Sequence, residues 1–430
     1  MQCKGGTDVA ASGCMNRALV LAGGAARGAY EVGVIEHILH AVATDLGHDV
    51  ELPVLSGTSV GAINVCVLAA LADQPRGRAS QLCDTWTSLD IEQILRPDGC
   101  RLLALLAGLG GVRGRPSLRA PRLGGILDFS GIEHLLSGIP FARIEANLRD
   151  GRLRAVTMAT TEVETGRTVV FVATTGRLAR WRGDPTVTVK ADSLGLSHAL
   201  ASAAVPPLFP AVRIGDGYYC DGGLRQNVPL APALHMGADA LLVITPHHVP
   251  TATPTAAVAK DRERSFTEPL FLLGKTLSAL LLDRVDGDLE RTQQINAILS
   301  AAMRRCGPGI VDEIGHRLQA TGLRPLRPVD TLLVRASRSI GRLAADYVRT
   351  AAFRRRARGL VGRVLQRLAE GEAESEADLL SYLLFDGEFA RELIELGQQD
   401  ARARHEELCR FFSSSHGAAA ARPPRRRSHG

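Results

Sequence analysis

A serine between two glycines is the first candidate for chemistry in this chain of 430 residues. Ser59 is the centre of a Gly-x-Ser-x-Gly motif formed with Gly57 and Gly61, after an apolar run at 52–55 and before an Ala/Val/Leu-rich segment at 62–71. This order predicts a buried strand, a sharp turn and a helix. Glycines permit the tight turn, and the N–H groups of the helix N-terminus favour developing negative charge. We therefore predict that Ser59 is a nucleophile, although the motif alone is a weak signal.

An aspartate in a second glycine-marked turn is the candidate partner of this serine. Asp221 follows the strand-like run 218–220 and precedes Gly222 and Gly223. A carboxylate in such a turn can accept the proton of a serine hydroxyl, so Asp221 is the predicted general base. An ordinary Asp-Gly turn is the competing interpretation of the same residues.

A third glycine-marked turn, residues 23–28, follows an apolar run at 17–22. Side chains are absent or minimal over its first three residues, so their N–H groups can bind the oxyanion of a tetrahedral intermediate. The arginine in the turn can reinforce this field or hold a phosphate, and a solvated or structural role is equally open. The candidate oxyanion residues are Gly23, Gly24, Ala25 and Arg27, and Gly28 closes the motif.

The elements that must position these turns alternate between strands and helices. Strand-like runs at 17–22 and 52–57 are separated by a helical pattern at 29–43. This alternation predicts an α/β fold, with a mostly parallel sheet covered by helices on both faces. Turns at the carboxyl ends of parallel strands share one edge, where we expect the three turns to meet. Further strands are expected at 154–160, 168–173, 211–214, 218–220 and 240–245.

Taken together, the three turns resemble those of the patatin-like phospholipase family. Its glycine-rich oxyanion motif matches residues 23–28, with Ala25 where a third glycine is commoner, and the Gly-x-Ser-x-Gly and Asp-Gly-Gly motifs match in order and separation. Residues 201–210 are also similar to that family. The resemblance spans about residues 17–245 and, more loosely, a bacterial form with a helical extension. It implies a Ser59–Asp221 dyad that acts on acyl esters of lipids, with phospholipids as the leading expectation.

Several other functions remain open alternatives. A general carboxylesterase or thioesterase would use the same groups. A conventional α/β-hydrolase would need a late histidine, and the serine comes early for that fold. A dinucleotide-binding oxidoreductase would use residues 23–28 as its phosphate loop, but Ala25 replaces the glycine that lies against the pyrophosphate. A catalytically silent lipid-binding scaffold would not need both Ser59 and Asp221.

Composition and the pattern of apolar residues suggest how the chain is divided into domains and tails. With 45% hydrophobic and 22% charged residues, the chain is typical of a globular protein. A strand-like run at 329–334 needs a sheet to join, so we expect the later helical part to pack on the core. The expected parts are a tail at 1–16, a patatin-like catalytic core at 17–250, a mostly helical extension at 251–412 and a disordered basic tail at 413–430.

Charge and apolar patterning bear on the partners of the protein. The formal net charge is +6, and an apolar segment at 102–127 carries Arg113, Arg115 and Arg119. Both are compatible with peripheral contact with an anionic membrane, although arginine is abundant throughout and a solvated role is equally open. No run reaches the roughly 18 uncharged apolar residues of a membrane span. We expect a cytoplasmic protein that can contact a membrane peripherally, with a lipid or acyl-ester substrate, no transmembrane segment and no nucleic-acid partner.

The cysteines and histidines give no sign of a metal site. Eight cysteines are scattered without Cys-x-x-Cys spacing, so reduced buried thiols are expected. Residues 1–16 lack the apolar core of a secretory signal. Because the chemistry of a serine–aspartate dyad is self-contained, we expect that hydrolysis needs no metal ion and no organic cofactor.

Overall fold

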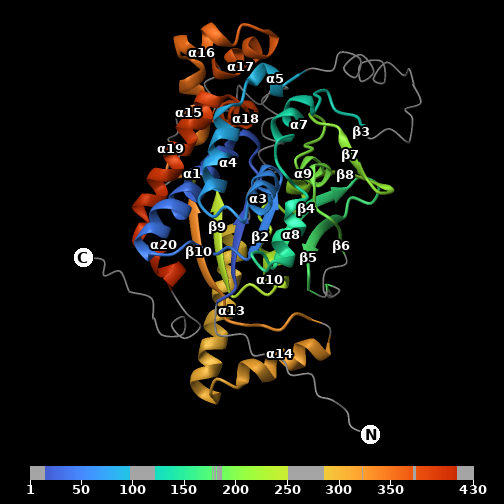
Figure 1. Cartoon of the computed structure of the whole chain (residues 1–430), viewed down its shortest axis with the longest axis vertical. Helices are drawn as coiled ribbons and strands as arrows, with labels where there is room; N and C mark the ends of the chain where they lie inside the picture. Colours follow the sequence, from blue (N-terminus) through green and yellow to red (C-terminus); the bar gives the residue numbers. More distant parts are fainter. Residues whose placement is uncertain are drawn as a thin grey trace, which may run out of the picture.

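A ten-stranded sheet runs through the middle of the molecule, as the computed structural model in Figure 1 shows. The strand order is β10-β9-β1-β2-β4-β8-β7-β3, and β5 and β6 continue from the other edge of β4. The five strands β10, β9, β1, β2 and β4 are parallel neighbours, so the predicted mostly parallel α/β sheet is confirmed. The strands are β1 (Arg17–Leu21), β2 (Val54–Thr58), β3 (Arg122–Leu123), β4 (Ala155–Glu162), β5 (Thr168–Thr174), β6 (Val187–Ala191), β7 (Ala211–Ile214), β8 (Gly217–Asp221), β9 (Ala240–Thr245) and β10 (Asp330–Arg335).

The structure describes residues 15–96, 122–176, 178, 181, 186–249, 285–321, 323–370 and 374–413. Most of the arginine-bearing segment predicted at 102–127, with Arg113, Arg115 and Arg119, lies outside these residues, as do nearly all of both predicted tails. In the described part of the chain, no helix combines the length and the apolarity that a membrane span requires.

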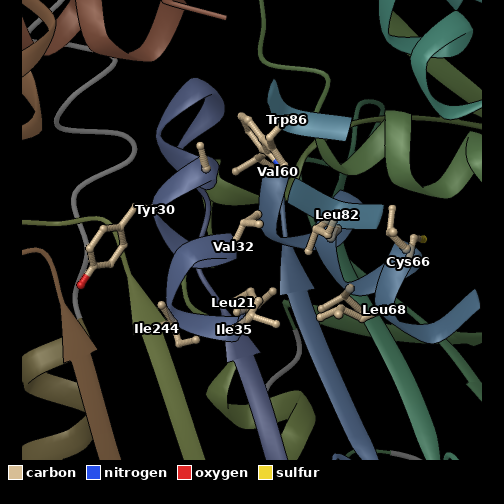
Figure 2. Close-up of a cluster of buried hydrophobic side chains, with 14 of the residues drawn as sticks. Leu21, Tyr30, Val32, Ile35, Val60, Cys66, Leu68, Leu82, Trp86 and Ile244 are labelled. Atoms are coloured by element: carbon tan, nitrogen blue, oxygen red, sulfur yellow. The ribbon is translucent and has the colours of Figure 1, made fainter. Parts of the chain in front are cut away.

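Helices cover both faces of the sheet because side chains alternate between the faces along each strand. Leu19 and Leu21 of β1 lie in the larger buried cluster, together with side chains from α1, α3 and α4. Figure 2 shows Leu21 in this layer with Val32 and Ile35 of α1. Ala18 and Val20 point to the opposite face, where they meet α10 and α13. These helices are α1 (Ala29–His37), α3 (Val60–Ala70), α4 (Gly77–Thr87), α10 (Leu230–His235) and α13 (Val285–Cys306).

Most of the remaining long helices belong to the C-terminal region, and shorter helices connect the strands. The strand predicted at 329–334 is β10, which joins the sheet beside β9. Among the C-terminal helices, α19 packs directly on α1, whereas α14 packs on α13 at the other end of the molecule (Figure 1). The C-terminal helices are α14 (Ile310–Ala320), α15 (Ile340–Val348), α16 (Ala351–Arg356), α17 (Leu360–Glu370), α18 (Glu374–Leu383), α19 (Gly387–Ala403) and α20 (His405–Ser413). Shorter elements are η1 (Ala25–Gly28), η2 (Ile38–Val42), α2 (Ala43–Leu46), α5 (Ile91–Ile94), α7 (Ser130–Leu136), α8 (Arg143–Arg149), α9 (Leu196–Ser202) and η3 (Gly222–Leu224).

Two strands lie end to end along one edge of β4. β2 pairs with its first part in parallel, with Thr58 opposite Ala159, and β8 pairs with its last part in antiparallel, with Asp221 opposite Thr160. Because β5 occupies the other edge of β4, the carboxyl ends of β2 and β8 meet head to head. The expectation that Asp221 follows a parallel strand is therefore wrong. A two-residue turn that begins at Gly215, with φ of 58°, pairs β8 with β7 as a hairpin and reverses its direction.

Candidate active site

Ser59 occupies a strained turn between β2 and α3. Its backbone has φ of 54° and ψ of −127°, a region that non-glycine residues adopt at a cost of about 1–3 kcal/mol. The turn is tight enough that a Cβ on Gly61 would lie 2.6 Å from the carbonyl oxygen of Leu21. A Cβ on Gly57 would lie 2.5 Å from the carbonyl oxygen of Gly61. Both motif glycines are thus required by the close approach of backbone segments.

The hydroxyl of Ser59 faces the carboxylate of Asp221. The Oγ of Ser59 donates a hydrogen bond to Oδ2 of Asp221 over 2.6 Å, and Oδ1 of Asp221 accepts one from the N–H of Gly223 over 2.7 Å. Asp221 is fully buried, with an exposed fraction of 0%. Burial raises the pKa of its carboxyl group to about 7, although both hydrogen bonds act to lower it. The structure thus brings together two residues that the sequence places 162 positions apart.

Neighbouring strands and α9 fix the backbone of both residues. The N–H of Asp221 donates to the carbonyl of Ala204, and a Cβ on Gly222 would lie 2.3 Å from the carbonyl oxygen of Ala159. Ser202 of α9 joins the two halves, because its Oγ accepts the N–H of Ser59 over 2.9 Å and donates to the carbonyl of Ala159 over 2.7 Å. No role for Ser202 was predicted from the sequence, although it lies within the family-like stretch 201–210.

A buried amide ties the helix after Ser59 to the helix after the glycine-rich turn. Nδ2 of Asn64 in α3 donates to Oε2 of Glu31 over 2.9 Å and to the carbonyl of Gly28 over 3.2 Å. Its Oδ1 accepts the indole N–H of Trp86 over 2.9 Å. These contacts fix α3, which follows Ser59, relative to α1, which follows the glycine-rich turn. Nothing in the local sequence around Asn64 indicates them.

The glycine-rich turn lies beside Ser59, but only part of it offers hydrogen-bond donors. The N–H of Gly23 donates to the carbonyl of Asn227 over 3.0 Å, so this group is not available to an oxyanion as predicted. Within the described residues, no acceptor takes the N–H of Gly24 or of Ala25. Ala25 has φ of 48°, which explains physically why glycine would suit this position better.

Arg27 points away from the turn and into the C-terminal region. Its Nε donates to Oγ of Ser381 over 2.7 Å, and its Nη2 forms an ion pair with Asp378 over 2.8 Å. Its guanidinium also lies 3.9 Å from the centre of the Tyr382 ring. The prediction that Arg27 belongs to the oxyanion hole therefore does not fit this geometry. The side chain is buried against α18, which supplies a carboxylate, a hydroxyl and an aromatic face for its charge.

Comparison with known proteins agrees with the geometry of the three turns. A family model described as "Patatin-like phospholipase" matches residues 19–234, which is half of the chain. The chain belongs to the patatin-like phospholipase family. Membership places it, at the level of the family, among lipid acyl hydrolases. The crystal structure of VipD from Legionella pneumophila is similar at 12% sequence identity and a TM-score of 0.30, over 88% of this chain and 92% of that chain. No curated protein matches the chain.

An apolar pocket adjoins Ser59 in this patatin-like core. Its walls come from the glycine-rich turn, from α3 and α7, from the segment after α9 and from the C-terminal region. The lining is almost wholly apolar, with Ser59 and Tyr382 as the only side chains that carry oxygen atoms, so the pocket suits a hydrocarbon chain better than a charged group. The lining residues are Ala25, Ser59, Val60, Ile63, Ile132, Ala203, Val205, Leu208, Phe209, Leu379, Tyr382, Leu383 and Phe385.

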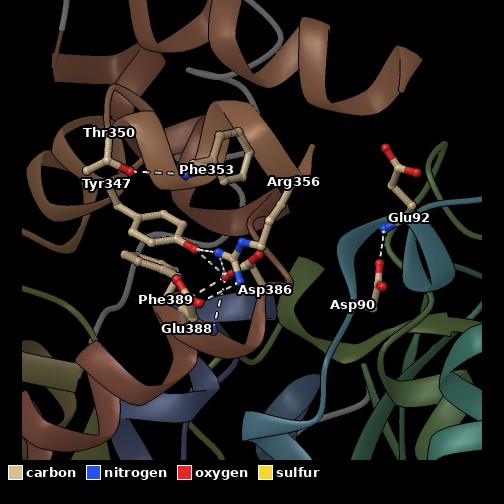
Figure 3. A network of polar contacts seen from close by, with 9 residues as sticks. All are labelled: Asp90, Glu92, Tyr347, Thr350, Phe353, Arg356, Asp386, Glu388 and Phe389. Atoms are coloured by element: carbon tan, nitrogen blue, oxygen red, sulfur yellow. Dashed lines mark hydrogen bonds and ion pairs between the residues drawn. The ribbon is translucent and has the colours of Figure 1, made fainter. Parts of the chain in front are cut away.

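A polar cluster fixes the turn that carries the last of these side chains, Phe385. The neighbouring Asp386 accepts the N–H groups of Glu388 and Phe389 through Oδ1 and so caps α19. The same oxygen accepts the hydroxyl of Tyr347 in α15 over 2.5 Å, as Figure 3 shows. The C-terminal wall of the pocket is therefore held by its own buried hydrogen bonds as well as by Arg27.

Proposed function

We propose that this protein hydrolyses carboxylic esters of lipids, and phospholipids above all, through an acyl intermediate on Ser59. The observation that carries the proposal is the 2.6 Å hydrogen bond between Oγ of Ser59 and Oδ2 of Asp221. It joins a nucleophile to a base within the reach that proton transfer needs. The raised pKa of Asp221, about 7, suits a base that must hold and release a proton near neutral pH.

In the first half of the proposed reaction, Ser59 attacks the acyl carbonyl carbon while its proton passes to Asp221. The N–H groups of Gly24 and Ala25 stabilise the oxyanion of the tetrahedral intermediate. The C–O bond to the alcohol then breaks, and Asp221 returns the proton to that leaving oxygen. In the second half, a water molecule attacks the acyl-serine, Asp221 accepts the water proton, and the fatty acid leaves as Ser59 regains its hydrogen.

The apolar pocket supports a lipid acyl group as the substrate. An acyl chain seated between Ile63 of α3 and Leu383 of α18 would have its carbonyl next to Ser59. Apolar contact of this kind binds long chains more tightly than short ones, at about 0.8 kcal/mol for each buried methylene. The expectation for phospholipids above other lipid esters rests on the family and on the basic charge of the chain.

The dyad is tested with purified wild-type, Ser59→Ala and Asp221→Ala proteins. Substrates are anionic phospholipid vesicles, neutral glyceride emulsions, short soluble esters and an acyl thioester. We expect wild type to release fatty acid from the vesicles, and each variant to lose nearly all of this activity. A fluorophosphonate should label Ser59 alone, as mass spectrometry of the digested protein would detect.

Matched controls are Ser137→Ala and Asp150→Asn, because both residues lie on the surface. They should leave the release of fatty acid unchanged. Hydrolysis that persists in both dyad variants would overturn the mechanism. Turnover restricted to short esters or to the thioester, without vesicle hydrolysis, would replace the lipid substrate with that of a general carboxylesterase or thioesterase.

A further inference from the structure

Three metal-binding side chains meet where the last described helix reaches the end of the first helical segment. The ligand atoms of Asp45, His405 and Cys409 all lie within 4.8 Å of one another. Nε2 of His405 is 2.8 Å from Oδ2 of Asp45 and 3.4 Å from Sγ of Cys409. In the described part of the chain, this is the only group of His, Cys, Asp and Glu side chains that meets so closely.

The spacing of these atoms is close to that of a tetrahedral zinc site. With metal–ligand bonds of 2.0–2.3 Å, ligand atoms in a tetrahedron are about 3.3 to 3.8 Å apart. The separation of His405 from Cys409 already matches, because positions i and i+4 of α20 share one helix face. Asp45 has a side chain that is 64% exposed, so it can move the remaining distance at little cost.

A second histidine orients the first one. Nε2 of His37 in α1 lies 3.0 Å from Nδ1 of His405, and the two rings meet edge to face. When Nδ1 of His405 carries the proton and donates it to His37, the lone pair on Nε2 faces Asp45 and Cys409. Histidines that bind metals are oriented in this way by a partner on the other ring nitrogen.

We propose that Asp45, His405 and Cys409 bind a zinc ion, with water as the fourth ligand and His37 as the orienting partner. The mixed oxygen, nitrogen and sulfur donor set suits zinc better than magnesium or calcium. Binding displaces the thiol proton of Cys409 into solvent. The ion joins α20 to α2 and so fastens the end of the C-terminal region to the core.

This site is separate from the dyad. The consecutive helices α1, η2 and α2 separate Asp45 from the glycine-rich turn. At 1.5 Å per residue, this segment puts Asp45 on the order of 20 Å from the turn. The sequence has no paired cysteines, so no metal site was expected. The spacing of His405 and Cys409 was present, but Asp45 and His37 come from the opposite end of the chain.

Cobalt and zinc binding test the proposal on the full-length protein without an affinity tag. Cobalt(II) added to chelator-treated protein should give the visible bands of a tetrahedral site and a near-ultraviolet thiolate band. Zinc at about a hundredfold excess over its Kd should raise the Tm by about 2 to 5 °C. Asp45→Asn and Cys409→Ser should each reduce the zinc-dependent rise in Tm and weaken cobalt binding at least about tenfold.

The matched control is Cys306→Ser, because Cys306 is an exposed cysteine outside the cluster. It should keep both the thiolate band and the rise in Tm. A cobalt spectrum without a thiolate band, or one that Cys409→Ser leaves unchanged, would overturn the proposal. Ester hydrolysis measured well below the Tm should be the same with and without chelator, so loss of the dyad and loss of the zinc site are distinguishable.

Discussion

At the scale of single residues, Asp221 combines two demands that oppose each other. In the proposed mechanism it must be ionised to accept a proton from Ser59, yet it is fully buried, and burial raises its pKa to about 7. The hydrogen bonds from Ser59 and Gly223 keep the charged form accessible. The residue is therefore half ionised near neutral pH, which couples both activity and stability to pH.

The pH profile of hydrolysis follows from this pKa. We expect kcat/KM for a soluble ester to rise with pH through an apparent pKa of about 7, and to fall about tenfold per unit below it, because only ionised Asp221 accepts the serine proton. Initial rates over a series of buffers measure this. An acid limb centred near 3.8, the usual value for aspartate, would contradict the assignment.

Stability changes with pH in the opposite direction. Folded Asp221 holds its proton more tightly than the unfolded chain does, so its contribution to stability is fully present below about pH 4 and is lost as pH rises through about 7. Asp221→Asn should therefore raise the Tm relative to wild type more at about pH 8 than at about pH 4. Asp150→Asn, on the surface, should show no such difference. Equal effects at both pH values would argue against the raised pKa.

At the scale of elements, the sequence predicts each motif but not how the chain brings them together. Runs of apolar residues and glycines predict β1, β2 and β9 because these elements are defined by local pattern. The direction of β8 was missed although the short turn at Gly215, between two strand-like runs, is a hairpin signal. That signal predicts the antiparallel direction of β8, but not the pairing of β8 with β4 that brings Asp221 to Ser59.

Long-range contacts could not be predicted from local pattern. The contacts of Arg27 with Asp378 and Ser381 join residues more than 350 positions apart. No repeat or spacing relates the turn at 23–28 to α18, so a catalytic role for Arg27 was as reasonable as a structural one. The packing of Arg27 against α18 favours the structural role.

The position of the C-terminal wall of the pocket predicts how activity depends on the length of the acyl chain. Leu383→Trp adds bulk to a half-buried position that faces the pocket. We expect kcat/KM for long-chain esters to fall at least about tenfold, while short esters are affected little, because only long chains need that part of the pocket. Val364→Trp, at a position of α17 that is 45% exposed, is the control for added bulk. A uniform loss over all chain lengths would contradict the assignment of this wall.

At the scale of the whole molecule, the C-terminal region is built into the core. β10 extends the sheet, and α19 approaches α1 so closely that a Cβ on Gly33 would lie 2.0 Å from the carbonyl oxygen of Ile394. On the other helix, a Cβ on Gly397 would lie 2.2 Å from the carbonyl oxygen of Tyr30. Glycine on both helices thus permits direct contact of their backbones over a large apolar area.

We therefore propose that residues 251–412 do not form an independent module. A chain truncated after residue 249 would expose the edge of β9 and the apolar face of α1, and would leave Arg27 without Asp378 and Ser381. We expect it to be insoluble or inactive. Sedimentation and ester hydrolysis measure this, with a chain ending after residue 413 as the matched control. A soluble and fully active truncated chain would refute the proposal.

The position of the pocket wall also has a consequence during synthesis of the protein. Ser59 lies near the beginning of the described chain, whereas the wall comes from residues 379–385. At about 5–20 residues per second, a ribosome needs roughly 16 to 64 seconds to pass from one to the other. The nascent chain thus carries Ser59 well before the C-terminal wall of the pocket exists. In the proposed mechanism, the complete site for an acyl chain forms only when almost all of the described chain has been made.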